Sequence, residues 1–303
     1  MLEFVQQLIN GISLGSIYAL IALGYTMIYG ILRFINFAHG DVFMIGAYSG
    51  YYLAILFGFS SATGTMSLTL AFLILIGSMV ICSLLGFTIE KLAYKPLRSS
   101  PKLTILITAI GISLFLEYSG QLVFGADPKS FPTLVENTPA FNLGGTVIYS
   151  YPLIIIFTTL ILIIGLRLIV MRTKMGTAMR AVSYNITAAS LMGININKTI
   201  SFTFIIGSSL AAAAGILFGL TYPKIDPLIG IIYGLKAFVA AVLGGIGNIT
   251  GAALGGLILG TVETFVSGYL SSTYRDAIAF AILIIILLVK PTGLMGKKEI
   301  EKV

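Results

Sequence analysis

The chain has 303 residues, of which 57% are hydrophobic and 10% are charged, and its formal net charge is +7. Soluble domains carry about 25% charged residues, so the composition excludes a soluble fold of this length, which would have to hide too much apolar surface. The positive charge does not indicate nucleic-acid binding, because the basic residues stand in short loops between apolar segments, as membrane topology alone produces. The composition therefore indicates an integral membrane protein.

The apolar segments are about twenty residues long and uninterrupted, which favours spanning helices over the roughly 10-residue alternating strands of a barrel. We expect an all-α integral membrane protein, a polytopic helical bundle of about 8–10 membrane segments with at least one broken or half helix. It should form one transmembrane domain over residues 1–303. In chain order, hydropathy predicts segments at about 6–30, 41–58, 66–88, 103–124, 149–170, 200–222, 235–247, 250–268 and 277–290.

The loops differ in charge, and this difference predicts the orientation. Loops 91–102 and 171–199 each carry four basic residues and no acidic one, and the tail 291–303 is rich in lysine. Loop 125–148 has more acidic than basic residues. The positive-inside rule places the first three in the cytoplasm and the last outside. The N-terminus is then outside, the C-terminus is cytoplasmic, and the histidine near position 39 lies at or near the cytoplasmic side.

A glycine-rich stretch divides the long apolar region before the tail. Loop 171–199 and the tail are both assigned to the cytoplasm, so an even number of segments must cross between them. Hydropathy alone shows three apolar blocks there, and the middle one contains "LGGIGNITGAALGG", with Gly244, Gly245 and Gly247 close together. Glycine at this density breaks a helix. We therefore expect a short segment or half helix before the break and a full span after it.

The stretch "RFINFAHGDVF" interrupts the apolar sequence and holds the only histidine, His39. Gly40 is expected to end one helix, and Asp41 to stand where the N-cap of the next would accept backbone N–H groups. Asn36 and His39 supply polar atoms for a non-helical backbone. Such backbone within a membrane must be buried in protein or face water, so the stretch is either a structural turn or part of a transport path.

Few other residues carry chemistry. One histidine and one cysteine are too few for a metal cluster of the usual His/Cys types, and the chain has no G-x-x-x-x-G-K-[ST] phosphate-binding loop. We expect no enzyme activity, no metal and no cofactor. Glu263 lies inside an apolar segment, where an unpaired carboxylate is costly. It either lines a water-filled path or makes a hydrogen bond between helices. Glu117 is expected near the headgroups.

Loop 171–199 is too polar to span the membrane. Apolar residues recur at intervals of three and four from Thr177 to Met192, which predicts one amphipathic helix, and Gly193 follows as a stop. A short helix with an apolar face in a basic loop can lie on lipid headgroups or dock into a groove on a partner. The pattern alone leaves both interpretations open.

Three stretches together resemble the LivH-type permease of bacterial branched-chain amino acid ABC importers. They are "NGISLGSIYALIALGYTMIYGILRFINFAHGD", "AVSYNITAASLMGININKTISFTFIIGSSLAAAAGIL" and "GLKAFVAAVLGGIGNITGAALGG". The resemblance covers essentially the whole chain in order. It implies a multi-pass protein of the bacterial inner membrane that works with a similar second permease, two cytoplasmic ATPase subunits and a periplasmic or lipid-anchored substrate-binding protein.

The resemblance also gives loop 171–199 a role. It is similar to the Ala-Ala…Gly coupling loop of ABC importers, whose short helix fits a groove on the ATPase, and Ala188, Ala189, Met192 and Gly193 are the residues expected to couple. The Glu that often precedes the two alanines is Thr187 here. This departure puts an ion pair at that position in doubt, but it does not argue against docking.

We therefore expect the membrane-spanning permease subunit of an ATP-driven importer of branched-chain amino acids that works by alternating access. A urea or short-chain amide importer, an importer of other amino acids, and a stand-alone proton-coupled transporter remain as alternatives. Whether the permease pairs with a copy of itself or with a different chain is open. The residues expected at the translocation path or at a helix break are Asn36, His39, Gly40, Asp41, Gly244, Gly245, Gly247 and Glu263.

Overall fold

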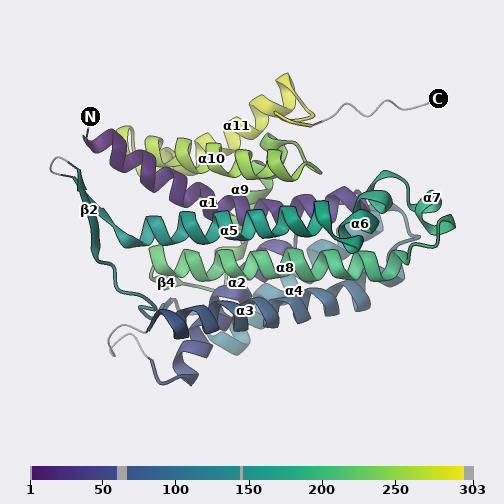
Figure 1. Ribbon diagram of the computed structural model, residues 1–303, viewed down its shortest axis with the longest axis horizontal. Coiled ribbons are helices and arrows are strands. Elements are labelled where there is room, and N and C mark those ends of the chain that lie inside the picture. The colour runs from purple at the N-terminus through teal and green to yellow at the C-terminus, as the bar shows by residue number, and fades with distance from the viewer. Residues whose placement is uncertain (1, 60–66, 144–145, 297–303) are drawn as a thin grey trace.

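The computed structural model describes residues 2–59, 67–143 and 146–296, and it is a bundle of helices with a few short strands (Figure 1). The elements are, in order, α1 (Leu2–Leu32), α2 (His39–Leu56), α3 (Leu68–Ile89), α4 (Lys102–Phe124), β1 (Lys129–Ser130), β2 (Pro139–Leu143), β3 (Thr146–Tyr149), α5 (Ser150–Arg172), α6 (Lys174–Tyr184), α7 (Ile186–Leu191), α8 (Ile196–Thr221), β4 (Lys224–Ile225), α9 (Ile229–Gly244), α10 (Ile249–Tyr269) and α11 (Arg275–Val289).

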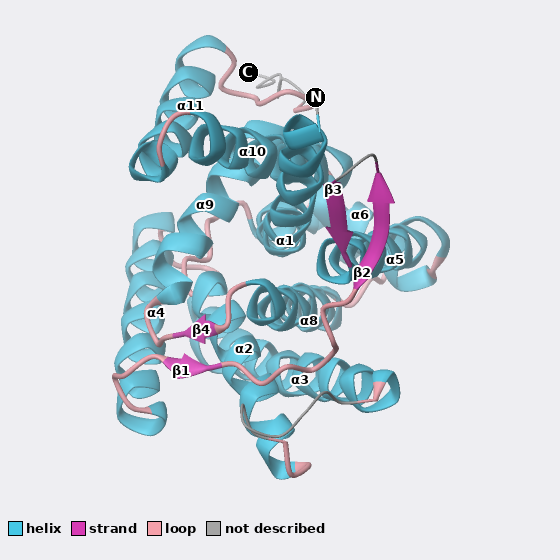
Figure 2. Cartoon of the chain, turned by 90° about the vertical axis from the view of Figure 1, so that its left-hand side faces the viewer, coloured by secondary structure: helices cyan, strands magenta, loops and turns pink. Residues whose placement is uncertain are grey.

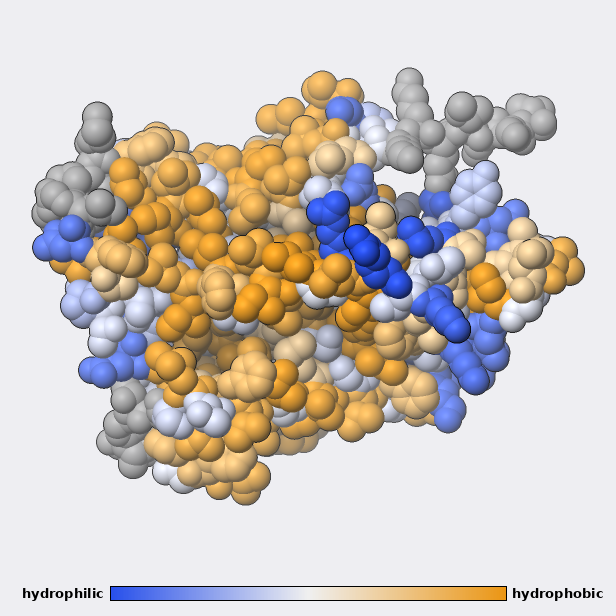
Figure 3. Space-filling model, viewed as in Figure 1, coloured by the Kyte–Doolittle hydropathy of each residue, from blue (hydrophilic) through white to orange (hydrophobic). Residues whose placement is uncertain are grey.

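Each of the nine predicted apolar segments corresponds to one helix. Within the described residues, seven helices are long and apolar enough to cross a membrane, and α2 and α9, of 18 and 16 residues, account for the other two segments. The chain is thus a polytopic helical membrane protein. Hydrophobic residues cover the middle of the face in Figure 3, and hydrophilic residues gather toward its right-hand end.

The helices form an inner group and an outer group. In the view along the bundle α1 lies at the centre, with α5, α8, α9 and α10 around it (Figure 2). In the most apolar 18-residue stretch of α1, 94% of the residues are buried within the chain, against 6% in the stretch that covers α11. α3, α4 and α5 also leave most of their apolar side chains uncovered. Such surfaces suit lipid or another membrane protein, and they would be costly in water.

The two ends of the bundle differ. At the end where α1 begins, called here the N-terminal end, β1 pairs with β4 in antiparallel register, and β2 and β3 form a hairpin. The predicted external loop 125–148 therefore contains short strands. At the opposite end, called here the α6–α7 end, lie α6, α7 and the turn after α9 (Figure 1). Of the tail 291–303, residues 297–303 lie outside the described part.

Candidate functional site

The α6–α7 end carries an open groove of about 460 Å³ between α6 and α7. Its lining is mostly apolar and comes from both helices. The side chains of Tyr184, Leu191 and Met192 around it are 92%, 84% and 82% exposed, which leaves large apolar groups uncovered beside the hollow. Residues that line the groove are Thr177, Arg180, Ala181, Tyr184, Asn185, Ala188, Ala189, Met192 and Ile194.

The continuous helix predicted over 177–192 is wrong, because the chain breaks at Asn185. This residue is extended, with φ −157° and ψ 111°, and its side-chain oxygen accepts a hydrogen bond from the backbone N–H of Ala188 at 2.9 Å. Asparagine satisfies an exposed N–H of a new helix in this way. The break turns α7 away from α6 and so creates the groove.

The four residues expected to couple have different environments. Ala188 and Met192 are exposed and line the groove, whereas Ala189 lines it but is only 4% exposed and packs into the core. Gly193 ends the α7 turn with φ +79°, and its N–H bonds to the carbonyl of Ser190 at 3.0 Å. A left-handed backbone favours glycine at such a stop.

Short contacts tie α6 to the end of α1. The Ser183 hydroxyl of α6 donates to the carbonyl oxygen of Gly30 at 2.6 Å, and the Arg33 guanidinium donates to the carbonyl oxygen of Ser183 at 3.3 Å. α1 is the most buried of the long helices. These contacts join α6 to the helix at the centre of the bundle.

The stretch "RFINFAHGDVF" forms a re-entrant break between α1 and α2. α1 ends at Leu32, and Arg33 has φ +56°, which stops the helix. The side-chain oxygen of Asn36 accepts a hydrogen bond from the buried Tyr94 hydroxyl at 2.6 Å. Asn36 therefore anchors the break. Sequence reasoning missed this partner, because Tyr94 lies beyond the end of α3, far from Asn36 in the sequence.

His39 lies inside the bundle and not at its end. Its ring packs edge-on against Tyr25 of α1, with centroids 4.9 Å apart, and a Cβ on Gly24 would overlap the ring. Gly24 stands about 12 Å along α1 from its end at Leu32, at 1.5 Å per residue. His39 thus lies deeper in the bundle than the end of α1, whereas its position relative to the cytoplasmic side stays a prediction. The ring is fully buried, and its nitrogens make no hydrogen bond of normal geometry to any described residue.

Gly40 and Asp41 do not act as the helix stop and N-cap that the sequence suggested. α2 already begins at His39 after a helical Ala38, with no side-chain cap. The Asp41 carboxylate instead accepts a hydrogen bond from the Ser113 hydroxyl of α4 at 2.5 Å. That hydroxyl also lies 3.4 Å from the carboxyl group of Glu117, which is buried within the chain. Tertiary contacts outweigh the local capping signal.

α9 begins where α2 begins, at the same depth in the bundle. A Cβ on Gly40 would lie 2.5 Å from the carbonyl oxygen of Gly230 and 2.9 Å from the Cα of Gly234, so only glycine permits this approach. The chain reaches α9 from β4 at the N-terminal end, and α9 then runs to the opposite end. It is the half helix that the sequence predicted, although it starts earlier, at Ile229. The N-terminal ends of two helices, with the positive ends of their dipoles, thus meet inside the bundle.

The predicted break at the glycine cluster is present, and the chain segment after α11 packs into it. α9 ends at Gly244, α10 begins at Ile249, and the side chain of Asn248 caps α10 by accepting from Gly251 at 3.1 Å. The chain after α11 returns here, with the N–H of Leu294 bonded to Leu243 at 2.8 Å and that of Met295 to Gly244 at 3.0 Å. Gly244, Gly245 and Gly247 therefore support a packed turn at the α6–α7 end.

Glu263 is the centre of a buried ion-pair cluster. Its carboxylate accepts from Lys236 of α9 at 2.7 Å, from Tyr18 of α1 at 2.8 Å, and from Arg275 of α11. Lys236 also lies 2.6 Å from Asp276. Two cations and two anions thus join α9, α10 and α11, and the Tyr18 hydroxyl adds α1. The sequence offered a lysine inside an apolar helix as a signal for this cluster, but no local spacing relates it to Glu263.

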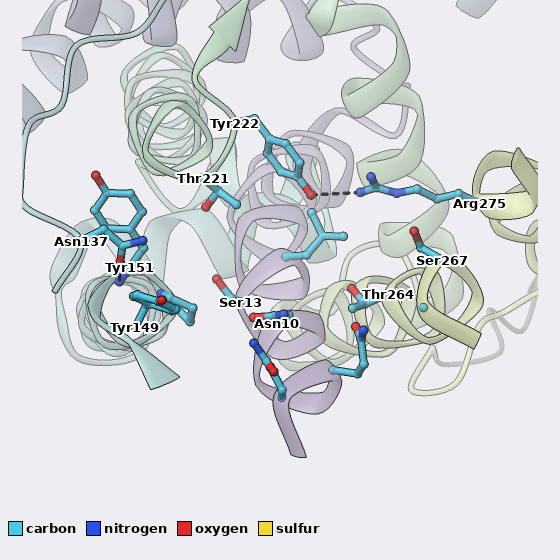
Figure 4. A pocket seen from close by; sticks show the side chains of 15 residues that line it. Asn10, Ser13, Asn137, Tyr149, Tyr151, Thr221, Tyr222, Thr264, Ser267 and Arg275 are labelled. Carbon is cyan, nitrogen blue, oxygen red and sulfur yellow. Dashed lines mark hydrogen bonds between the residues drawn. The ribbon is translucent and has the colours of Figure 1, made fainter. Parts of the chain in front are cut away.

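A second cavity, of about 490 Å³, opens at the N-terminal end between α1, α5, α10 and α11. Asn10 and Ser13 face it from α1, and Thr264 and Ser267 from α10 (Figure 4). Arg275 lies at its edge and donates to the Tyr222 hydroxyl at 3.2 Å. Sequence reasoning missed this cavity, because its lining residues are ordinary polar side chains that only the packing of the helices brings together.

Comparison with known proteins agrees with this architecture. The profile of the family described as branched-chain amino acid transport system / permease component matches residues 7–287. The chain is 45% identical to the high-affinity branched-chain amino acid transport system permease protein LivH of Escherichia coli K12, over 100% of this chain and 98% of that one. It is 43% identical to the corresponding permease protein BraD of Pseudomonas aeruginosa, over 99% and 98%. No solved structure matches. The chain belongs to the family of permease components of branched-chain amino acid transport systems.

Proposed function

We propose that this chain is the membrane-spanning subunit through which an ATP-driven importer carries branched-chain amino acids. The chain itself is not an enzyme in this account, and ATP is hydrolysed on separate partner chains. The observation that carries the proposal is the groove between α6 and α7, where large apolar side chains stand uncovered beside a hollow lined by Ala188 and Ala189. Such a surface suits a protein partner.

The groove is the proposed docking surface for the ATPase. Small residues at Ala188 and Ala189 let a partner approach the α7 backbone, and the exposed Met192 and Tyr184 provide apolar contact area. Movement of the ATPase would shift α6 and α7 and reach α1 through the contacts of Ser183 with Gly30 and Arg33. Nucleotide-driven motion thereby becomes a change in the core of the bundle.

The proposal fixes an orientation. The α6–α7 end faces the cytoplasm, where the ATPases are, and the basic loops 91–102 and 171–199 agree with this placement. The N-terminus, loop 125–148 and the N-terminal cavity then face outward, toward a periplasmic or lipid-anchored binding protein. The membrane is the bacterial inner membrane.

The re-entrant break supports alternating access. The positive dipole ends of two helices that meet inside a bundle favour an anionic ligand without a fixed positive charge. The buried ring of His39 and the carboxyl group of Asp41 lie at this place, with Asn36 and Gly40 holding its shape. We place the path here because two helices begin inside the bundle beside these polar side chains. Glu263 and the glycine turn at 244–247 are assigned to support.

The assembly is proposed to contain a second, similar permease, two ATPase subunits and a substrate-binding protein. The uncovered apolar faces of α3, α4, α5 and α11 leave ample area for lipid and a second permease. A proton-coupled transporter that works alone finds no support, because Glu263 is held by two cations, whereas a relay needs a carboxylate free to exchange protons.

The docking surface can be tested by charge substitution at adjacent positions. Ala188→Glu places a carboxylate in the groove and should abolish co-purification of the ATPase subunits with the permease. Thr187→Glu is the matched control, because Thr187 is exposed but does not line the groove, and it should retain the ATPase. Equal retention by both variants, at equal membrane insertion, would show that the groove is not the docking surface.

A further inference from the structure

The cavity at the N-terminal end has the size and the mixed lining of a small-molecule site. Its volume of about 490 Å³ falls within the range of about 300–1,000 Å³ for ligand pockets. Polar side chains from α1, α10 and α11 converge on it in Figure 4, with Tyr149 and Tyr151 on the other side, and Pro152 also lines it. No sequence motif marked it, and the docking and gating described above do not use it.

Arg275 is the charged residue of the lining. Its Nε donates to Glu263 and its Nη2 to Tyr222, while Nη1 makes no hydrogen bond with any residue that the structure describes. The side chain is 22% exposed, so the guanidinium is held in place by two partners and still reaches the cavity. A fixed guanidinium with unused N–H groups recognises a carboxylate better than any other side chain does.

The other lining residues match the rest of a hydrophobic amino acid. The amide oxygen of Asn10 and the hydroxyls of Ser13 and Thr264 offer neutral acceptors for an ammonium group. Leu14 and Pro152 offer apolar surface for a branched side chain. No carboxylate lines the cavity among the described residues, so a ligand with a net positive charge finds no counter-ion there.

We propose that this cavity is a low-affinity binding site for a zwitterionic amino acid with an apolar side chain, whose carboxylate is received by Arg275. The inference rests on the proposed function, under which the cavity faces outward, and it deepens that function by assigning a first binding site within the permease. The site would also discriminate between classes of substrate, because urea and uncharged amides lack the carboxylate that Arg275 receives. Weak affinity is expected, since the acceptors for the ammonium group are uncharged and the Arg275 charge is shared with Glu263.

Binding of radiolabelled leucine to the complete transporter in nanodiscs, without nucleotide or binding protein, tests the site. Wild type should bind leucine in a saturable manner, and leucinol, which lacks the carboxylate, should compete at least tenfold more weakly than unlabelled leucine. Arg275→Gln should lower the affinity at least tenfold. Asn10→Leu should lower the affinity as well, and it leaves the Glu263 cluster intact. It therefore tests the site even if Arg275→Gln fails to fold. Lys224→Gln is the charge-matched control, since Lys224 is exposed and does not line the cavity.

The outcomes separate this inference from the proposed function. Competition by leucinol equal to that by leucine, unchanged affinity in Asn10→Leu, or absence of saturable binding would overturn the site. ATP-driven uptake by the same wild-type preparation, supplied with binding protein, is measured in parallel. If uptake proceeds and the binding results fail, the transport function stands and the site is refuted. If uptake fails, the proposed function is refuted.

Discussion

The ammonium of Lys236 in α9 lies 2.7 Å from the carboxylate of Glu263 in α10, and the two side chains are only 2% and 1% exposed. α9 and α10 are consecutive helices separated by the glycine turn, and Glu263 also reaches α1 through Tyr18 and α11 through Arg275. Buried charges are tolerated when they are paired and hydrogen-bonded. The cluster therefore fixes the half helix α9 against the centre of the bundle.

Glu263→Gln should destabilise the protein by about 3 kcal/mol, because it leaves Arg275 without its carboxylate partner and the buried Lys236 with only the half-exposed Asp276. Asp276→Asn is the matched control: Asp276 contacts the same lysine but is 55% exposed, so its loss should cost less than about 1 kcal/mol. Thermal unfolding of the purified permease in detergent measures both. A Glu263→Gln midpoint equal to that of Asp276→Asn would contradict the anchoring role.

Asp41→Ala should lower the folded yield by a loss of about 1–3 kcal/mol, since it removes a buried hydrogen bond between α2 and α4 and leaves the Ser113 hydroxyl without that partner. Ser113→Ala removes the same bond from the other side and separates the two roles of Asp41. If Asp41 only joins the helices, the two variants should lose yield and uptake in parallel. Normal yield with lost uptake in Asp41→Ala alone would assign Asp41 to the path.

Gly193→Val should uncouple ATP hydrolysis from transport, because a β-branched side chain strains the left-handed backbone at φ +79° and displaces the end of α7. Space is not the limit, since a Cβ there would meet nothing within 4 Å. Gly193→Asn is the control, because asparagine tolerates this conformation, and it should retain most coupling. The ratio of substrate moved to ATP hydrolysed is the measurement, and equal ratios in both variants would refute the backbone argument.

Ser130→Cys should react with an impermeant maleimide added to intact cells, whereas Lys174→Cys should react only after permeabilisation. Ser130 lies in β1 at the N-terminal end, and Lys174 begins α6 at the other end; both are exposed. The native cysteine, Cys82, is buried and gives little background. The reverse labelling pattern would overturn the proposed orientation.

Hydropathy and glycine spacing were enough to find all nine apolar helices and the break between α9 and α10. These features depend on runs of neighbouring residues, which the sequence displays directly. The local signals at Asp41 and over 177–192 were misleading, because Ser113 captures the Asp41 side chain and Asn185 starts a second helix. Propensity yields to tertiary contacts in such places.

The sites that depend on several helices could not be derived from the sequence. Glu263 was singled out as a costly acid inside an apolar segment, but its partners Lys236, Arg275 and Tyr18 come from three other helices. The N-terminal cavity likewise exists only once its helices are packed. The groove was not predicted, since the amphipathic pattern indicated one helix with an apolar face and not its division into two.

Substrate uptake into proteoliposomes tests the central claim most directly. The vesicles contain the complete transporter, with the ATPase subunits exposed to ATP and the binding protein on the opposite side. The account predicts leucine uptake that requires ATP, persists without a proton gradient and is lost in Ala188→Glu but not in Thr187→Glu. Uptake by the permease chain alone, driven by a proton gradient and unaffected by Ala188→Glu, would contradict it.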